Sequence, residues 1–390
     1  MPRFEPFRAI RYASDDLADL TAPPYDVLSE ADVLAEREKS PNNFTVIDVV
    51  LDGDYAGVTK TLNQWLEDGV LQRDDTDSFT IYRLGFTDEL GRERNIVGVL
   101  GGLEVVDEGA GGVLPHEHTT PKAKTDRLDL THATNTNLSP VWGLSLAAGL
   151  ADALAEPGEL LGSFKIDGVS HTVERISDPT RIAAISGLIG NADVLIADGH
   201  HRYAISRTYR DQLRASGNPN PNADLTLTFV NELTEDQLSI AAIHRLISNV
   251  SFDDLTAMLA QRFDLSSAPA PSAELLAEMV ALGRLALLAP NGDVFWLTPK
   301  PGAFDHLRDL DSLWLEETLS PLDGVTLTYQ HGLDEVVHEL GSGKFTAAIL
   351  IRPTSIEEIR RTALEGLLMP PKSTFFSPKL RSGLVVRPLD

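Results

Sequence analysis

The segment 194–206, VLIADGHHRYAIS, places charged and imidazole side chains directly after four apolar residues. The group consists of Asp198, Gly199, His200, His201 and Arg202. Glycine lets the backbone bend sharply and approach a ligand closely. The planar guanidinium of an arginine can hold a phosphate group by two hydrogen bonds. These residue types, at this spacing, indicate a site for a phosphate-bearing ligand.

The residues on either side of this group predict where it lies. The run VLIA is short and β-branched, as is typical of a strand buried on both faces. Ile205, Tyr209 and Leu213 follow at helical spacing. The group therefore lies on a strand-to-helix turn, where the first amide groups of the helix favour an anion. A plain helix start, with Asp198 as its cap and both histidines bonded to neighbouring backbone, explains the same residues.

A second group of reactive side chains lies in the segment 114–128, LPHEHTTPKAKTDRL. If the HEH stretch is extended, His116 and His118 point to one side and Glu117 to the other. This arrangement permits a carboxylate base beside imidazole groups, with Glu117 as the first candidate base and His116 as the second. Three cations that could neutralise a phosphate or bind a metabolite carboxylate follow in the same segment: Lys122, Lys124 and Arg127.

Two further segments are stiffened by neighbouring prolines. APPYDV (22–27) presents Tyr25 and Asp26, and MPPKSTFFSPK (369–379) presents Lys372 and Ser373. Hydroxyl groups and lysines on a stiff loop suit contact with a phosphate or a nucleotide. A plain turn into a helix explains the first segment equally well, and a polar surface loop explains the second.

The possible metal chemistry is narrow. The chain contains no cysteine, which excludes thiol catalysis and thiolate metal sites. Zinc is the weaker hypothesis, because the adjacent His200 and His201 cannot easily bind one ion and no HExxH motif is present. Mg²⁺ prefers oxygen ligands and needs few of them from the protein when a phosphate is bound. We therefore expect Mg²⁺, with Asp198 or Asp126 as its protein ligands.

The composition limits the classes of function. The 390 residues are 42% hydrophobic and 6% aromatic, as in an ordinary soluble globular protein. The formal net charge of −25 repels nucleic acid and anionic membranes. The first residues lack the apolar region of a secretion signal, and no apolar stretch approaches the roughly 18 residues of a membrane span. We expect a cytoplasmic protein that binds neither nucleic acid nor a membrane.

The spacing of apolar residues predicts a mixed α/β (α+β) chain. The helices are expected over 30–39, 57–69, 147–155, 180–190, 203–215, 251–263 and 355–368. The strands are expected over 44–50, 79–87, 94–106, 163–169, 194–197, 226–233 and 345–351, with a hairpin turn at 291–292. The segment 108–140 shows little periodicity, and a loop of that length is usually functional. A stretch rich in Asn, Pro and Gly after residue 214 indicates a motif-bearing domain over 1–215 and a C-terminal mixed α/β region over 216–390, which contributes the MPPKSTFF loop.

Five motifs in order carry a resemblance to a known family: APPYDV, LPHEHTxxKxKxDRL, NLSP (137–140), ADGHHRY and MPPKSTFFSPK. Over residues 22–379 the chain resembles an uncharacterised family of bacterial and archaeal proteins, the domain of unknown function numbered one thousand and fifteen. The fold of that family is similar to the ParB/sulfiredoxin superfamily, in which a G-x-[HRT]-R turn at a helix start binds nucleotide phosphates. The corresponding residues here run from Gly199 to Arg202, with Asp198 before them as in free-serine kinases.

This resemblance implies a nucleotide-dependent activity. The superfamily includes CTP-binding segregation proteins, which need DNA, and ATP-dependent sulfiredoxins, which need a cysteine. The charge opposes the first activity and the composition excludes the second. What remains is a small-molecule kinase, which moves a phosphoryl group between a nucleotide (ADP, ATP or CTP, with Mg²⁺) and a hydroxylated metabolite. The resemblance to serine kinases, and the family's association with serine biosynthesis genes, favour serine and phosphoserine as the pair, in either direction.

The motif positions imply a role for each residue. The expected catalytic residues are Glu117, His116, Asp198 and His200. The expected nucleotide-binding residues are Gly199, His201, Arg202, Lys122, Lys124, Arg127, Lys372 and Ser373. The expected substrate-binding residues are Tyr25, Asp26, Asn137 and Ser139.

Two other classes of function stay open. A metal-dependent phosphatase or hydrolase built on the histidines would purify with a transition metal and release phosphate without an acceptor. A nucleotide-binding regulatory protein would bind a nucleotide tightly and form no product with any small hydroxy compound. The sequence also leaves open whether the chain forms a homodimer.

Overall fold

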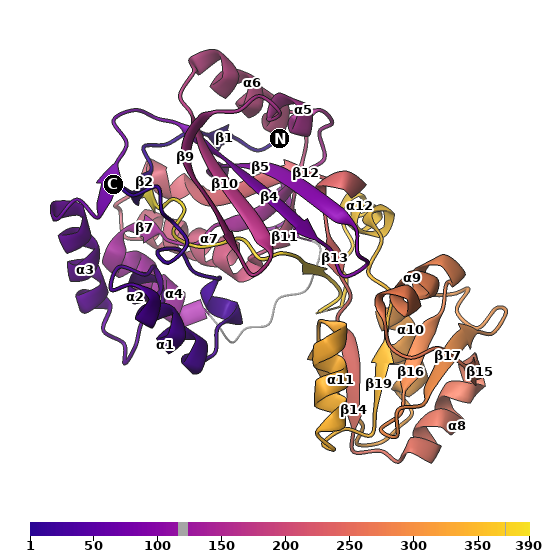
Figure 1. Cartoon of the computed structure of the whole chain (residues 1–390). Helices are drawn as coiled ribbons and strands as arrows, with labels where there is room; N and C mark the ends of the chain where they lie inside the picture. Colours follow the sequence, from indigo (N-terminus) through magenta and orange to yellow (C-terminus); the bar gives the residue numbers. More distant parts are fainter. Residues whose placement is uncertain (116–123, 371) are drawn as a thin grey trace. The chain divides into compact units, whose positions relative to one another are not determined.

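The computed structural model describes residues 1–115, 124–370 and 372–390, and it confirms the predicted mixed α/β class (Figure 1). Contacts between residues divide the chain into two compact units. Unit 1 comprises Met1–Phe86, Arg94–Leu238 and Pro378–Asp390, and unit 2 comprises Thr87–Glu93 and Ser239–Ser377. Both units are discontinuous in sequence. The break predicted at residue 215 lies within unit 1, and the main crossing to unit 2 follows residue 238.

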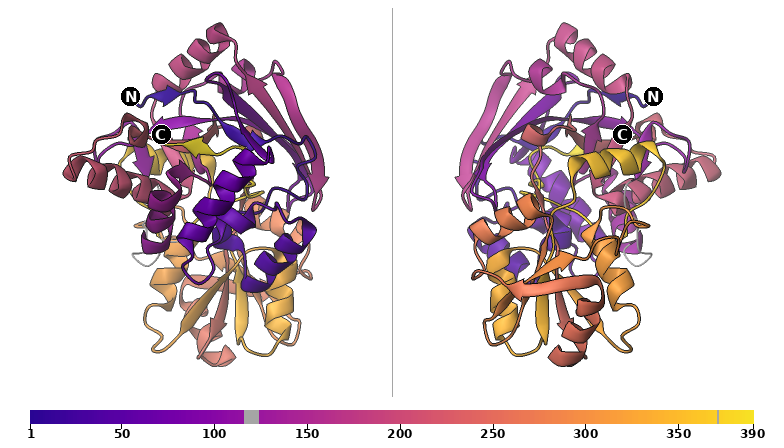
Figure 2. Two further views of the ribbon diagram at one scale, coloured as in Figure 1. Left: turned by 90° about the vertical axis from the view of Figure 1, so that its left-hand side faces the viewer. Right: turned by 90° about the vertical axis from the view of Figure 1, so that its right-hand side faces the viewer.

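Unit 1 is built on a mixed nine-stranded sheet with the strand order β6-β11-β8-β12-β5-β4-β10-β9, in which β1 also pairs with β5. β11 is parallel to β6, and β12 is parallel to β8. Figure 2 shows that β4, β9 and β10 form a strongly curved layer. The strands are β1 (Phe4–Glu5), β4 (Phe79–Thr87), β5 (Glu93–Glu104), β6 (Val113–Pro115), β8 (Val141–Ser145), β9 (Glu159–Ile166), β10 (Val169–Ile176), β11 (Val194–Asp198) and β12 (Leu225–Glu232).

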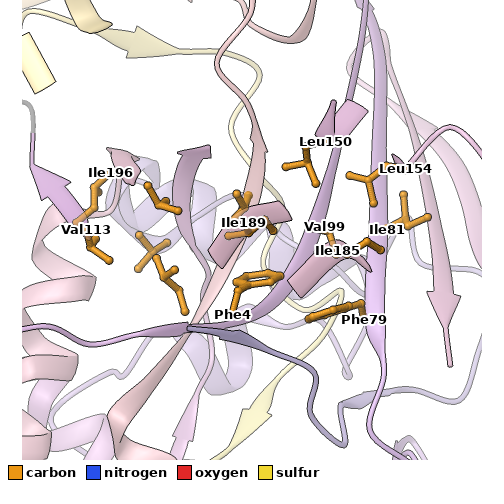
Figure 3. Close-up of a cluster of buried hydrophobic side chains, with 14 of the residues drawn as sticks. Phe4, Phe79, Ile81, Val99, Val113, Leu150, Leu154, Ile185, Ile189 and Ile196 are labelled. Atoms are coloured by element: carbon orange, nitrogen blue, oxygen red, sulfur yellow. The ribbon is translucent and has the colours of Figure 1, made fainter. Parts of the chain in front are cut away.

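The apolar core of unit 1 lies between this sheet and two helices, α5 (Leu150–Ala153) and α6 (Pro179–Gly190). Ile185 and Ile189 recur at helical spacing on α6 and are fully buried. Figure 3 shows them beside Phe4 and Phe79, whose rings stack on the sheet with their centroids 5.0 Å apart. This core holds β11 firmly, so the turn that follows β11 starts from a fixed point.

The remaining helices of unit 1 are α1 (Glu30–Lys39), α2 (Thr45–Asp48), α3 (Tyr55–Glu67), α4 (Lys124–Thr134) and α7 (His200–Ala215). α4 packs against both α3 and α7. The chain end also belongs to this unit, because β21 (Arg387–Pro388) pairs with β7 (Thr136–Asn137) and Ser382 forms a β-bridge with Ala22. A further small pair joins β2 (Ile10–Tyr12) to β3 (Leu71–Arg73). Segments from both ends of the chain thus meet around α4 and α7.

Unit 2 is an antiparallel six-stranded sheet, ordered β15-β17-β16-β19-β14-β18, with helices on both faces. Side chains alternate between the two faces: Leu285 and Leu287 of β16 join the cluster with α8 and α10, whereas Ala286 and Leu288 join the cluster with α9 and α11. The strands are β14 (His244–Ser248), β15 (Phe263–Ser267), β16 (Leu285–Leu288), β17 (Val294–Pro299), β18 (Thr326–Gln330) and β19 (Ala347–Leu350), with β13 (Ile240–Ala241) and β20 (Phe375–Phe376) as a separate pair. The helices are α8 (Phe252–Arg262), α9 (Ala273–Leu282), α10 (Asp311–Leu319), α11 (Leu333–Gly341) and α12 (Ile356–Leu364).

The predicted strand over 44–50 is wrong, because this segment contains the short helix α2. The side chain of Asn43 accepts hydrogen bonds from the backbone and the hydroxyl of Thr45, which starts a helical turn. Phe44 and Ile47, three residues apart, are then both fully buried on one side of that turn. The β-branched composition favoured a strand, but the cap from Asn43 and the burial of Phe44 and Ile47 stabilise a helix.

The loop predicted over 108–140 contains β6, α4 and β7. The apolar pattern of α4 is weak, because Thr131 and Thr134 lie where apolar residues would mark a helix, and their hydroxyls bond to backbone carbonyls four residues earlier. The helices predicted over 30–39, 57–69 and 180–190 are confirmed as α1, α3 and α6. Among the helices of the described ranges, none combines the length and apolar character needed to cross a bilayer.

Candidate functional site

A cavity in unit 1 brings together residues that the sequence analysis selected from separate motifs. Tyr25, Arg127, Asn137, Ser139 and Arg202 all line it. Four more hydroxyl groups contribute to its walls, those of Thr131, Thr136, Ser206 and Thr226. The cavity offers about 40 Å³ to the centres of water-sized molecules. One water needs roughly 10–15 Å³ by this measure, so the cavity has room for small polar groups.

The DGHHR group lies on a strand-to-helix turn, as predicted: β11 ends at Asp198 and α7 begins at His200. Gly199 has a φ of +82°, a conformation that favours glycine. A Cβ atom on Gly199 would lie 3.0 Å from Cζ and Nε of Arg202. Glycine is therefore needed for the bend and for the close approach of the arginine side chain.

Arg202 is buried and faces three oxygen-bearing groups. Its Nη2 donates to Oδ2 of Asp198 at 2.8 Å and lies 3.6 Å from a carboxylate oxygen of Asp26, and its Nη1 donates to the carbonyl of Pro140. Burial alone would lower the pKa of Arg202, but the carboxylates of Asp26 and Asp198 raise it above its usual value. The side chain is therefore permanently charged. Its Nε has no hydrogen-bond partner among the residues that the structure describes.

Asp198 contacts two cations. Its Oδ2 accepts from Arg202 and its Oδ1 accepts from Nζ of Lys379 at 3.2 Å. Burial alone would raise the pKa of Asp198, but Lys379 and Arg202 hold it well below its usual range. Lys379 lies in the motif MPPKSTFFSPK, whose lysines were expected to bind a small anion, but no individual role was predicted for it. The return of the chain end to unit 1 brings it to Asp198.

Arg127 lies on α4 and is held between two groups. Its Nη1 donates to Oδ1 of Asp48 at 2.8 Å, and its Cζ lies 3.2 Å from the centroid of the Tyr25 ring. Within the described ranges its Nε has no hydrogen-bond partner, although a carboxylate oxygen of Asp126 lies 3.9 Å away. Burial raises the pKa of Tyr25 against the opposing charge of Arg127, so the phenol stays protonated.

Asp48 is a site residue that the sequence analysis missed, because the segment around it was predicted to be a strand. Its side chain is buried and accepts from the hydroxyl of Ser139 at 3.0 and 2.9 Å in addition to Arg127. Ser139 also lies 3.0 Å from the hydroxyl of Ser382. Asn137 uses its Oδ1 to accept from the backbone of Leu227 at 3.1 Å.

The other predicted site residues are distributed as follows. His116, Glu117 and Lys122 lie outside the described residues, and Lys124 is the first residue of α4. His200 and His201 are half-buried in the first turn of α7. Lys372 and Ser373 belong to unit 2, where the hydroxyl of Ser373 donates to the carbonyl of Pro370 at 2.7 Å. The roles assigned to all of these residues stay predictions.

The predicted ligands do not fit a magnesium site by themselves. Both oxygens of Asp198 already accept hydrogen bonds from cations. Asp126 is exposed and accepts from the hydroxyl of Tyr55 at 2.8 Å. Across residues 1–115, 124–370 and 372–390, no group of three or more His, Asp or Glu side chains could hold a metal ion. A divalent ion beside Asp198 would face the positive charges of Arg202 and Lys379.

The chain belongs to the family described as Protein of unknown function (DUF1015), whose model matches residues 4–313. This confirms the family predicted from the five motifs; the link to the ParB/sulfiredoxin superfamily stays a prediction. No curated protein matches the chain. Its place in this family therefore says nothing of an activity.

Several solved structures resemble the chain distantly. A free serine kinase in complex with AMP is 14% identical, with 70% of this chain and 89% of that chain covered and a TM-score of 0.37. A conserved hypothetical protein from Pyrococcus furiosus is 12% identical over 71% and 92% of the two chains, with a TM-score of 0.37. SbnI from Staphylococcus aureus, truncated at its C-terminus, is 13% identical over 74% and 87%, with a TM-score of 0.39. TM-scores this low do not establish a common fold.

Proposed function

We propose that this protein is a nucleotide-dependent phosphotransferase that acts on a small hydroxylated metabolite, with serine and phosphoserine as the preferred pair. The observation that carries the proposal is that residues from all five sequence motifs meet in unit 1. Tyr25, Arg127, Ser139 and Arg202 come from four of them and line one cavity, and Lys379 of the fifth bonds to Asp198. Binding and positioning of one reacting group is what such an arrangement can do.

The lining of the cavity suits one of the two proposed ligands. Hydroxyl groups, arginines and a few apolar side chains surround a small volume, which suits the reacting part of a small metabolite. The charges support a metabolite in the cavity, because Arg127, Arg202 and Lys379 are balanced by the carboxylates of Asp26, Asp48 and Asp198. We therefore place the metabolite in the cavity and the nucleotide phosphates at the Gly199 turn and the start of α7, where backbone amides favour anions.

The proposed step moves a phosphoryl group from the terminal phosphate of the nucleotide to the hydroxyl oxygen of the metabolite. The bond between phosphorus and the bridging oxygen of the nucleotide breaks, and a bond between phosphorus and the metabolite oxygen forms. The proton of the hydroxyl passes to a base, for which Glu117 is our candidate. Arg202 neutralises charge on the moving group, which is the main requirement of phosphoryl transfer. In this proposal Mg²⁺ arrives with the nucleotide.

The proposal is tested with purified protein, Mg²⁺ and a panel of ATP, ADP and CTP, each with serine or phosphoserine, followed by phosphorus NMR. We expect phosphate to move between nucleotide and amino acid. Arg202→Ala should lower nucleotide affinity by about 10- to 100-fold, the effect of a lost hydrogen bond to a charged group. Arg210→Ala is the matched control, because Arg210 is a buried, ion-paired arginine on the same helix that is not a wall residue of the cavity.

Three outcomes would replace this proposal. Unchanged nucleotide affinity in Arg202→Ala would remove the role of the Gly199 turn. Tight nucleotide binding without any product would indicate the regulatory class. Release of inorganic phosphate by protein that carries a transition metal, without an acceptor, would indicate a metal-dependent phosphatase or hydrolase.

A further inference from the structure

Two arginines that line the cavity, Arg127 and Arg202, each carry a buried Nε–H without a hydrogen-bond partner among the described residues. The two side chains are only 10% and 8% exposed. Buried donors in proteins are nearly always paired with an acceptor. Two cavity-lining arginines with such donors therefore point to a ligand that supplies the acceptors.

The ligand chemistry follows from the donors. Both donors are charged guanidinium groups, which favour an oxyanion. Each arginine offers one Nε–H, and two single donors match the two oxygens of a carboxylate. We therefore favour a carboxylate over a phosphate as the group between the two arginines.

We propose that the cavity binds the carboxylate of the small substrate on the Nε–H groups of Arg127 and Arg202, and that Asp48 is the residue that positions Arg127 for it. This inference rests on the proposed function for the identity of the substrate, a hydroxy or amino acid that carries the reacting hydroxyl. Beyond the proposed function, the inference names the carboxylate as the group that the site recognises. It also names Asp48, which lies outside every sequence motif, as a positioning residue.

Asp48 binds the guanidinium of Arg127 on the side opposite its Nε–H. It accepts from Nη1 of Arg127, and the ring of Tyr25 covers the flat face of the same guanidinium. Asp48 does not line the cavity among the described residues, so it acts through Arg127 and is a positioning residue. With Nη1 and the ring face occupied, the guanidinium cannot rotate freely and its Nε–H keeps one direction.

Asp48 is itself held by other segments. The single hydroxyl proton of Ser139 is donated to Asp48, so Ser382 donates to the oxygen of Ser139. Ser382 is anchored in turn by its backbone N–H, which donates to the carbonyl of Ala22. α2, α4, the NLSP segment and the chain end therefore converge on one carboxylate, which makes the orientation of Arg127 a property of the fold of unit 1.

The test compares a ligand with a carboxylate and a ligand without one. Serine and serinol differ in that serinol carries a hydroxymethyl group in place of the carboxylate. Binding of each is measured by calorimetry to the full chain and to Asp48→Asn, which keeps the shape of the side chain and removes its charge. We expect Asp48→Asn to weaken serine binding by about 10- to 100-fold and to leave serinol binding unchanged.

Two further variants make the result specific. Arg127→Lys keeps the positive charge beside Asp48 and removes the Nε–H, so it should weaken serine binding as Asp48→Asn does. It tests the same contact if Asp48→Asn folds poorly. Asp311→Asn is the matched control, because Asp311 is a buried carboxylate that holds Arg352 in unit 2. It should leave the binding of both ligands unchanged.

The outcomes separate this inference from the proposed function. Equal weakening of serine and serinol in Asp48→Asn, or no weakening of serine in either site variant, would overturn the inference even if phosphoryl transfer is observed. If Asp48→Asn weakened the binding of inorganic phosphate and left serine binding unchanged, the site would bind a phosphate, and the proposal of a carboxylate ligand would be overturned. Serine binding that depends on Asp48 in a protein without phosphoryl transfer would uphold the inference and overturn the proposed function.

Discussion

Unit 1 and unit 2 each bury a carboxylate against an arginine, and the two pairs are built differently. In unit 2, Arg352 donates from its backbone N–H and its Nε to Asp311, and from its Nη2 to Asp311 and Asp309. In unit 1, Asp48 receives only Nη1 of Arg127, whose Nε has no partner among the described residues. The first pair uses its donors within the fold, as a structural ion pair does. The second keeps a donor at a cavity, as a binding site requires.

The two units also differ in how their apolar side chains are arranged. Unit 2 sandwiches its sheet between two aliphatic clusters. In unit 1 an apolar cluster supports the sheet, whereas the cavity beside α4 and α7 mixes hydroxyl groups and arginines with the apolar side chains of Leu130, Leu138 and Ile205. Buried polar groups cost stability unless they are paired, so a protein keeps unpaired ones mainly where they bind something. This comparison supports our proposal that unit 1 holds the binding site.

The largest expected effect comes from removal of either carboxylate. Asp311→Ala should lower the free energy of unfolding by about 3 kcal/mol, because it leaves the half-buried Arg352 without its main partner. Asp48→Ala should cost less, because a carboxylate oxygen of Asp126 lies 3.9 Å from Nε of Arg127. Denaturant unfolding of both variants measures the difference. A larger loss in Asp48→Ala would contradict the view that the unit 1 pair serves binding.

A smaller effect should appear on acidification, because each unit buries one neutral histidine. Burial lowers the pKa of His171 in unit 1 to about 4 and that of His244 in unit 2 to about 3. Both values lie below the usual 6.5, so the unfolded chain binds the proton first and stability falls as the pH drops below about 6.5. Between about pH 7 and pH 5 each histidine should remove about 2 kcal/mol from the free energy of unfolding.

Between pH 4 and pH 3 the unit 2 histidine should cost more stability than the unit 1 histidine, because His171, with a pKa of about 4, is already half protonated in the folded state at pH 4. Unfolding of His171→Gln and His244→Gln over this range measures the two contributions. If the two variants showed the same residual slope below pH 4, this difference between the units would be refuted.

The smallest expected effect distinguishes two serine hydroxyls. Ser382→Ala removes the donor to Ser139 in unit 1, and Ser373→Ala removes the donor to the Pro370 carbonyl in unit 2. Each should cost about 0.5–1.5 kcal/mol in the free energy of unfolding, as single hydrogen bonds do. Only Ser382→Ala should also weaken serine binding, because Ser139 contacts Asp48. Calorimetry with serine would refute the link between the chain end and the site if both variants bind serine like the unchanged protein.

The amino-acid sequence by itself determined the local elements and their chemistry. Helical spacing predicted α1, α3 and α6, and the change from an apolar run to DGHHR predicted the turn between β11 and α7. The five motifs predicted the family. These features depend on residues close together in the chain, so that composition and spacing are sufficient to recognise them.

Only the tertiary structure decided which distant residues meet at the cavity and around it. Asp48 and Ser139 are 91 residues apart, and Asp198 and Lys379 are 181 apart. A helix in place of the expected strand at 44–50, the unpredicted helix α4 and the return of the chain end to unit 1 bring them together. Ion pairs and unpaired donors of this kind arise from long-range packing, which leaves no periodic signal in the sequence.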